Sequence, residues 1–317
     1  MKHFLALLLA LMIPAVAQAR TGTPKQEDLQ RLFARLVQRH PRLYAHITPE
    51  DLQEKREGFA LAVDSMTDVE LYYALVELLA SIGDAHTGLR WTDGADRHLT
   101  ALPFSLARID GRWRLTACLP EYADRLGWEI LAMDGVPTEH VFESAKRIIS
   151  YETEPWAAEK FPDAIRYLES LQYLGITPQD AEGVSLTLRS PDGKEISVTL
   201  TGIPPTEPAP ALVTLGVAAP TTAPSGYYCA MPLDEKTLYI QYNTCEEDPV
   251  LPTSVFAETV RGMLEEGRYV KAALDLRYNT GGNSTIWYPL RDVLLDHQQS
   301  SGLTVYTLIG GKTYSSA

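Results

Sequence analysis

The sequence predicts an α/β protein with three regions: a helical N-terminal part, a β-rich middle and a C-terminal parallel sheet. Apolar residues recur at helical spacing between residues 26 and 82. Short apolar runs typical of strands dominate residues 99–203. From residue 237 onwards strand and helix patterns alternate, and this order favours parallel strands joined by right-handed helical crossovers.

The first residues of the chain have the pattern of an export signal. Lys2 gives a basic start, residues 4–16 form an apolar core, and Ala17-Gln18-Ala19 is a small-residue cleavage site. No later apolar run approaches the roughly 18 residues that a membrane span requires. We therefore predict a cleaved signal peptide over residues 1–19 and a secreted or periplasmic protein without a membrane span.

The composition excludes several classes of function. The formal net charge of -13 argues against nucleic acid and anionic membranes as partners. The three cysteines show no C-x-x-C spacing, and whether two of them pair stays open. The sequence also contains no H-E-x-x-H or equivalent, so it predicts neither a catalytic metal nor another cofactor.

Residues 20–92 are expected to form a helical N-terminal cap. Pro41 ends the first helix, Thr48-Pro49 starts a second, and Thr67 caps a third that runs to Ser81. Gly83 is the expected stop of the third helix. His86 therefore lies on a loop directly after a packed helix, at a defined but accessible place.

Residues 93–203 are predicted to be rich in strands. Strands are expected at residues 112–117, 184–189 and 195–200. Residues 122–135 resemble part of a PDZ domain, a fold that binds an extended peptide at a sheet edge. A long helical insertion, residues 141–174, departs from that pattern. Residues 204–224, rich in Pro, Thr and Ala, are interpreted as a linker.

Residues 225–317 are predicted to form the α/β core. The pattern predicts strands at residues 237–242, 270–277 and 303–309. It predicts helices between them, at residues 255–264 and 285–295. Ligands of parallel sheets bind beyond the carboxyl ends of the strands. The last strand lacks a returning helix, so we infer that the sequence is a fragment with an incomplete core, inactive by itself.

Two strand-end loops carry groups suited to chemistry. Gly281 and Gly282 can bring bare N–H groups close to a negative oxygen, and Asn283 or Ser284 can cap the following helix. The second loop offers the hydroxyls of Ser315 and Ser316. Serine needs a base to become nucleophilic, and histidine is the usual one near neutral pH.

Each of these residues also has a common structural interpretation. A glycine pair is more often a tight turn than an anion hole, and a serine at a helix start usually caps it. A histidine on a loop is more often a surface or capping residue than a catalytic one. Among the histidines, His86 has the best context for catalysis because a packed helix positions its loop.

A family resemblance changes this balance. Residues 274–284, L-D-L-R-Y-N-T-G-G-N-S, resemble the D-L-R-x-N-x-G-G signature of the C-terminal processing peptidases, serine peptidases that include tail-specific proteases and the tricorn core. Three further stretches agree in the family's order: residues 83–87, 237–243 and 313–317. The resemblance implies a crotonase-like (ClpP/crotonase) parallel-sheet core, a helical N-terminal cap and a PDZ-like domain that gates the site.

The resemblance also implies roles for individual residues. Ser315 would be the nucleophile, and His86 the general base, as in the tricorn-like branch. Asp84 would be a carboxylate that shapes the loop or supports the catalytic residues from behind, in preference to being a member of the catalytic triad. The oxyanion hole would consist of backbone amides of Gly281, Gly282 and Ser316; such donors are typically worth about 3 kcal/mol each in the transition state.

Departures from the family pattern leave part of the mechanism open. Ala85 stands where some tricorn-like members carry a serine that orients the histidine. The family's last element, a Glu or a Lys base, would lie beyond Ala317, so a Ser-Lys mechanism competes with Ser-His, which the G-D-A-H-T stretch favours.

The leading hypothesis is an exported serine endopeptidase that cleaves polypeptides through an acyl-enzyme. Its competitor is a non-catalytic peptide-binding or scaffolding protein that retains the fold. A third hypothesis is a glycosidase with paired carboxylates. The sequence contains many Asp and Glu residues but no motif that would identify such a pair.

Overall fold

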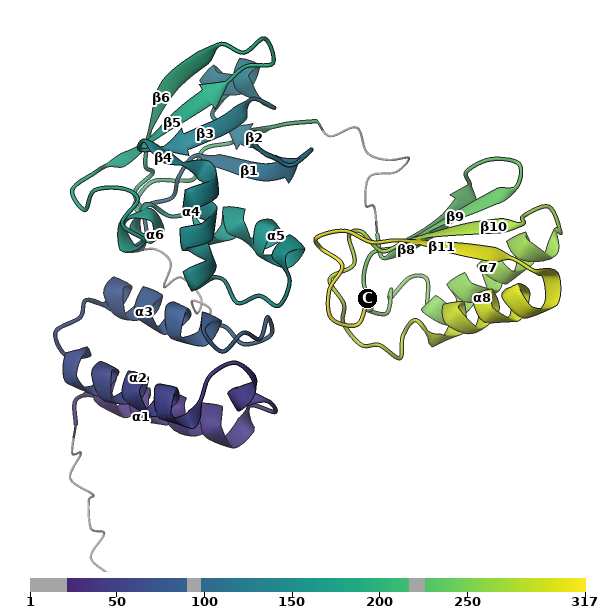
Figure 1. Ribbon diagram of the computed structural model, residues 1–317. Helices are drawn as coiled ribbons and strands as arrows, with labels where there is room; N and C mark the ends of the chain where they lie inside the picture. Colours follow the sequence, from purple (N-terminus) through teal and green to yellow (C-terminus); the bar gives the residue numbers. More distant parts are fainter. Residues whose placement is uncertain (1–21, 90–97, 217–225) are drawn as a thin grey trace, which may run out of the picture. The chain divides into compact units, whose positions relative to one another are not determined.

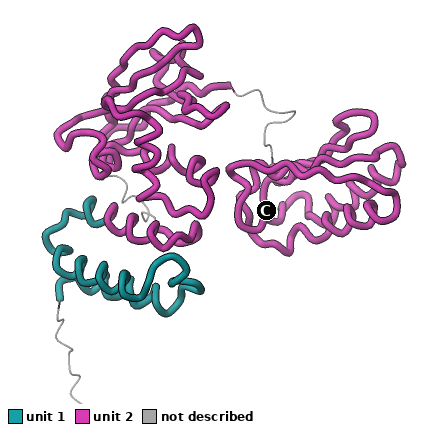
Figure 2. Tube along the Cα trace, in the orientation of Figure 1, with its two compact units in different colours: residues 1–71 teal, residues 72–317 magenta. Residues whose placement is uncertain are grey.

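The computed structural model describes residues 22–89, 98–216 and 226–317. The chain divides into two compact units, residues 1–71 and 72–317, which Figure 2 colours separately. The predicted signal peptide lies outside the described residues, as does part of the predicted linker. Within the described ranges, no helix is long and apolar enough to cross a membrane. The predicted domain boundaries stay predictions.

Helices make up the first unit, and side-chain caps set where they begin. The Thr23 hydroxyl accepts a hydrogen bond from the Gln26 amide, while the Gln26 side chain accepts one from the Thr23 amide. Thr48 and Asp51 form the same reciprocal pair. The helices are α1 (Pro24–Arg39), η1 (Leu43–Ala45), α2 (Pro49–Ala62) and α3 (Asp68–Ala80), the last continuing into the second unit. The helical character predicted for this stretch is confirmed.

An antiparallel sheet occupies the middle of the chain. Its main path runs β1-β2-β3-β5-β6, with β4 paired to β3 and β7 paired to β2. β1 is therefore an edge strand. The strands are β1 (Phe104–Ile109), β2 (Arg112–Cys118), β3 (Glu129–Met133), β4 (Val136–Pro137), β5 (Gly183–Arg189), β6 (Glu195–Thr201) and β7 (Val213–Thr214), and η3 (Pro120–Arg125) links β2 to β3. β7 falls in the stretch interpreted as a linker.

The helical insertion between β4 and β5 is broken rather than continuous. Thr153 accepts a hydrogen bond from the Trp156 amide and starts a new helix, with Pro155 in its first turn. A second break follows at residues 165–167. The predicted helical insertion over residues 141–174 is present, and local caps and prolines divide it into separate helices. The segments are α4 (Thr138–Ala145), η4 (Lys146–Ile148), α5 (Glu154–Ala164) and α6 (Leu168–Tyr173).

The C-terminal part contains a second sheet, ordered β11-β10-β9-β8. β9, β10 and β11 are parallel, as the strand–helix alternation predicts. β8 pairs antiparallel with β9 and was missed. Helices α7 and α8 lie on the same face of this sheet (Figure 1) and bury its apolar side chains. The elements are β8 (Tyr228–Pro232), β9 (Thr237–Tyr242), α7 (Thr253–Glu265), β10 (Lys271–Asp275), α8 (Tyr288–Ser301) and β11 (Thr304–Leu308).

The register of this sheet brings three loops to one edge. Asp275, at the end of β10, lies opposite Gln241 of β9 and Leu308 of β11. The Asp275 side chain is buried and accepts hydrogen bonds from Arg277 and from the Tyr239 hydroxyl, at 2.6 Å each. The loops that follow β9, β10 and β11 therefore leave the sheet at the same level.

Candidate active site

Hydrogen bonds to the loop after β10 hold the loop that carries Ser315. The Thr313 hydroxyl donates to the Leu276 carbonyl oxygen at 2.8 Å, and the Tyr314 amide donates to the Asn279 carbonyl oxygen at 3.0 Å. Ser315 follows with φ at +61°, in the left-handed region that non-glycine residues rarely occupy. This conformation typically costs about 1–2 kcal/mol and recurs at functional sites, where the surrounding structure holds it. The Ser315 side chain is exposed at this turn.

The two glycines are required by close packing. Gly281 has φ at +92°, and a Cβ there would lie 2.7 Å from the Tyr314 carbonyl oxygen and 2.7 Å from the Ser315 Cβ. Gly282 has φ at +137°, and a Cβ there would lie 2.5 Å from the Cys245 carbonyl oxygen. The predicted glycine loop thus contacts the Ser315 loop directly, and no larger residue fits without movement.

The buried side chain of Asn279 holds the glycine loop in place through hydrogen bonds. Its side chain is fully buried, its Nδ2 donates to the Tyr242 carbonyl oxygen at 3.0 Å, and its Oδ1 accepts the Gly281 amide at 2.8 Å. The Gly281 amide is therefore engaged in this conformation. Among the described residues, the amides of Gly282 and Ser316 donate no hydrogen bond, and the Ser316 hydroxyl donates to the Gly282 carbonyl oxygen at 2.9 Å.

The glycine loop does not lead directly into a helix, contrary to expectation. Asn283 Oδ1 accepts the Thr285 amide at 3.0 Å and closes a turn, and α8 begins only at Tyr288. The interpretation of Asn283 or Ser284 as the cap of the following helix was therefore wrong. Turn formation by the Asn283 side chain competes with capping.

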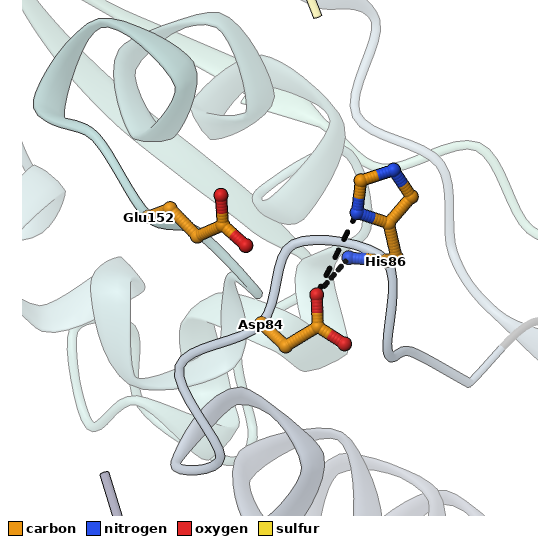
Figure 3. A group of neighbouring side chains, drawn as sticks. All are labelled: Asp84, His86 and Glu152. Carbon is orange, nitrogen blue, oxygen red and sulfur yellow. Dashed lines mark hydrogen bonds and ion pairs between the residues drawn. The ribbon is translucent and has the colours of Figure 1, made fainter. Parts of the chain in front are cut away.

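The imidazole of His86 reaches Ser315 from the loop after α3. His86 Nε2 lies 3.1 Å from Ser315 Oγ. Asp84 Oδ1 accepts the His86 backbone amide at 3.0 Å and lies 3.6 Å from His86 Nδ1 (Figure 3). The Thr87 hydroxyl donates to Asp84 Oδ2 at 2.6 Å and holds the carboxylate in place. Serine, imidazole and carboxylate therefore lie in sequence along one line of contacts.

Stacked aromatic rings fix the orientation of the imidazole. The His86 ring stacks on Tyr314, with centroids 4.6 Å apart, and Tyr314 stacks on Trp156 of α5 at 3.9 Å. Burial, together with the nearby carboxylates of Glu152 and Asp84, raises the pKa of Tyr314 to about 12, so this ring stays neutral. Trp156 and Tyr314 were not predicted as site residues, because their contact joins elements far apart in the sequence.

This arrangement is equipped for nucleophilic chemistry at a hydroxyl. A histidine within hydrogen-bond distance of a serine can take its proton, and a carboxylate beside the other ring nitrogen stabilises the resulting imidazolium. Backbone amides without other partners can stabilise a developing oxyanion. All six residues singled out in the sequence lie in or beside these contacts: Asp84, His86, Gly281, Gly282, Ser315 and Ser316.

Comparison with protein-family models and with curated proteins gives no match. Among solved structures, the chain is similar to mature CPAF complexed with lactacystin, at 15% identity and a TM-score of 0.54, over 84% of this chain and 58% of that chain. It is also similar to mature CPAF, at 15% identity and a TM-score of 0.51, over 82% and 56%. The photosystem II D1 C-terminal processing protease matches at 14% identity, over 85% and 64%, with a TM-score of only 0.34.

These similarities concern the fold. The chain spans less than three-fifths of the length of the two CPAF structures. A fold shared at this identity positions loops but does not by itself assign chemistry. The role of each residue therefore depends on its contacts in this chain.

Proposed function

We propose that the protein is an exported serine endopeptidase of the C-terminal processing type, with Ser315 as its nucleophile. The observation that carries the proposal is the 3.1 Å contact between His86 Nε2 and Ser315 Oγ, two side chains 229 residues apart in the sequence. The fold similarity to mature CPAF and the family-like order of the motifs are consistent with it. The crotonase-like core and the tricorn-like, histidine-type branch belong to this proposal.

In the first half of the reaction, His86 Nε2 accepts the Ser315 proton as Oγ attacks the carbonyl carbon of a peptide bond. The negative oxygen of the tetrahedral intermediate is stabilised by the amides of Gly282 and Ser316. His86 then protonates the leaving amine, the C–N bond breaks and an acyl-enzyme remains. In the second half, His86 takes a proton from water, the hydroxide attacks the ester, and the proton returns to Ser315 as the acid leaves.

The contribution of Gly281 is steric rather than electrostatic in this conformation. Its amide donates to Asn279, so the proposed oxyanion hole uses Gly282 and Ser316. Gly281 leaves room for the Ser315 Cβ and for the backbone of Tyr314 and Ser316. The Gly281 amide can donate to the oxyanion only if it no longer donates to Asn279 Oδ1.

Asp84 acts through His86 rather than on substrate. Its carboxylate favours the tautomer with a proton on Nδ1, which leaves Nε2 free to accept the Ser315 proton. A Ser-Lys mechanism has less support, because an imidazole nitrogen already lies 3.1 Å from the Ser315 hydroxyl oxygen.

A cleft offers a path for the polypeptide substrate. It has a volume of about 710 Å³ and is lined by the edge strand β1, by α5, and by Gly311 and Lys312. An extended peptide can add to an exposed strand edge through backbone hydrogen bonds, as in PDZ domains. Gly311 and Lys312 precede Ser315 on the same loop, so the cleft borders the loop that carries the proposed nucleophile.

A fluorophosphonate probe tests the proposal. It should label the full-length protein at Ser315, and Ser315→Ala should abolish labelling. Ser316→Ala is the matched control, because it removes the neighbouring hydroxyl but keeps the backbone amide, and it should still be labelled. A protein that binds peptides in the cleft but ignores the probe would instead be a non-catalytic binding protein.

A further inference from the structure

A second set of groups meets at His86, on the side away from Ser315. The carboxylate of Asp84, the imidazole of His86 and the carboxylate of Glu152 each present one ligand atom, and these atoms lie within 4.8 Å of one another. Figure 3 shows the Glu152 carboxylate turned toward the space beside Asp84 and His86. Glu152 comes from the segment between η4 and α5, so two distant loops form the cluster.

The spacing also fits two ligands of one metal ion. His86 Nδ1 and Asp84 Oδ1 are 3.6 Å apart, beyond normal hydrogen-bond length. Two ligands of a tetrahedral zinc ion, each ~2.05 Å from the metal, are ~3.4 Å apart. A small rotation of either side chain would match that separation, and Glu152 is exposed and free to close the third position.

The donor set selects the class of ion. One imidazole and two carboxylates suit borderline divalent ions such as Zn²⁺, and a fourth position is left for water. Two ligands are already positioned: Asp84 by the Thr87 hydroxyl, and the His86 ring by its stacking on Tyr314. The ion would therefore meet a partly preformed site that is accessible from solvent.

We propose that Asp84, His86 Nδ1 and Glu152 form a binding site for a divalent zinc-class ion, and that the bound ion inhibits the enzyme. An imidazole that binds metal through Nδ1 loses its Nδ1 proton to solvent and carries its remaining proton on Nε2. Nε2 then donates to Ser315 Oγ instead of accepting its proton. The ion is an inhibitor, not a cofactor of the reaction. The inhibition rests on the proposed function; the binding site does not.

Calorimetric titration of the full-length protein with Zn²⁺ tests the site itself. Wild type should show a binding event that His86→Ala lacks and that Glu152→Gln weakens at least ~10-fold, since loss of even an outer partner of a ligand costs 10–100-fold. Glu121→Gln is the matched control, because Glu121 is also exposed but lies outside the cluster, on η3. Circular dichroism of each variant checks that folding is retained. Equal zinc binding by wild type, His86→Ala and Glu152→Gln would overturn the site.

The rate of fluorophosphonate labelling tests the inhibition. Zn²⁺ should slow labelling of wild type and Glu121→Gln, and a chelator should restore it. Glu152→Gln should need a zinc concentration at least ~10-fold higher for the same slowing. Labelling that zinc leaves unchanged, in a protein that binds zinc through these residues, overturns the inhibitory role. Absence of labelling without metal refutes the proposed function instead, and the calorimetric result still decides the site.

Discussion

Replacing Gly281 by alanine tests whether close packing holds the nucleophile. The new Cβ would lie 2.7 Å from Ser315 Cβ and 2.9 Å from the Ser316 amide nitrogen, on a backbone with φ at +92°. Adopting the left-handed region costs a residue with a Cβ about 1–2 kcal/mol. Overpacking against backbone typically adds about 1–3 kcal/mol. We therefore expect the free energy of unfolding to fall by about 2–5 kcal/mol.

Gly267→Ala is the matched control for this substitution. Gly267 also has positive φ, at +76°, but a Cβ there meets no atom within 4 Å. In Gly267→Ala the free energy of unfolding should fall only by the cost of the left-handed conformation, about 1–2 kcal/mol. Urea unfolding with an unchanged m-value measures both losses. The reasoning is refuted if Gly281→Ala costs no more than Gly267→Ala.

The same pair of variants separates stability from activity. Displacing Ser315 by about 1 Å costs on the order of 100-fold in rate. Fluorophosphonate labelling should therefore slow strongly in Gly281→Ala and stay near the wild-type rate in Gly267→Ala, under conditions where both are folded. Equal labelling of the two would show that the Ser315 loop tolerates the extra methyl group.

Three further predictions concern the groups around the site. His86→Ala should slow probe labelling by about 10²–10⁴-fold, the usual contribution of a general base, while its urea midpoint changes little; a labelling rate near wild type would remove His86 from the mechanism. Burial opposes ionisation of Asp275, but hydrogen bonds from Arg277 outweigh the effect of burial and lower the pKa of Asp275. The stability that the ionised carboxylate adds should be lost as the pH falls below about 3.8. In Asp275→Asn, the urea midpoint should therefore fall less steeply with pH in that range. Asn279→Ala should destabilise the protein by about 2–5 kcal/mol, because it leaves a buried amide and a buried carbonyl without their partner; a loss below about 1 kcal/mol would contradict that role.

Local patterns in the sequence were enough to find most elements. The helix start at Thr48 depends on Asp51, three residues further on, so its capping can be predicted from the local sequence. The alternation of strands and helices after residue 237 similarly predicts the parallel order of β9, β10 and β11. β8 was missed, because its antiparallel place beside β9 depends on pairing rather than on its own short pattern.

The sequence by itself determined which residues can take part in nucleophilic catalysis. They are a histidine on the loop after a packed helix, a glycine pair after one strand and a serine after the next. Only the tertiary structure decided how they meet. The 3.1 Å contact of His86 with Ser315, the stacking of Tyr314 on Trp156 and the hydrogen bond from Asn279 to the Tyr242 carbonyl oxygen all join distant segments. Such contacts form only when tertiary packing brings distant parts of the chain together. Local propensity therefore cannot predict the distance between two side chains that are 229 residues apart.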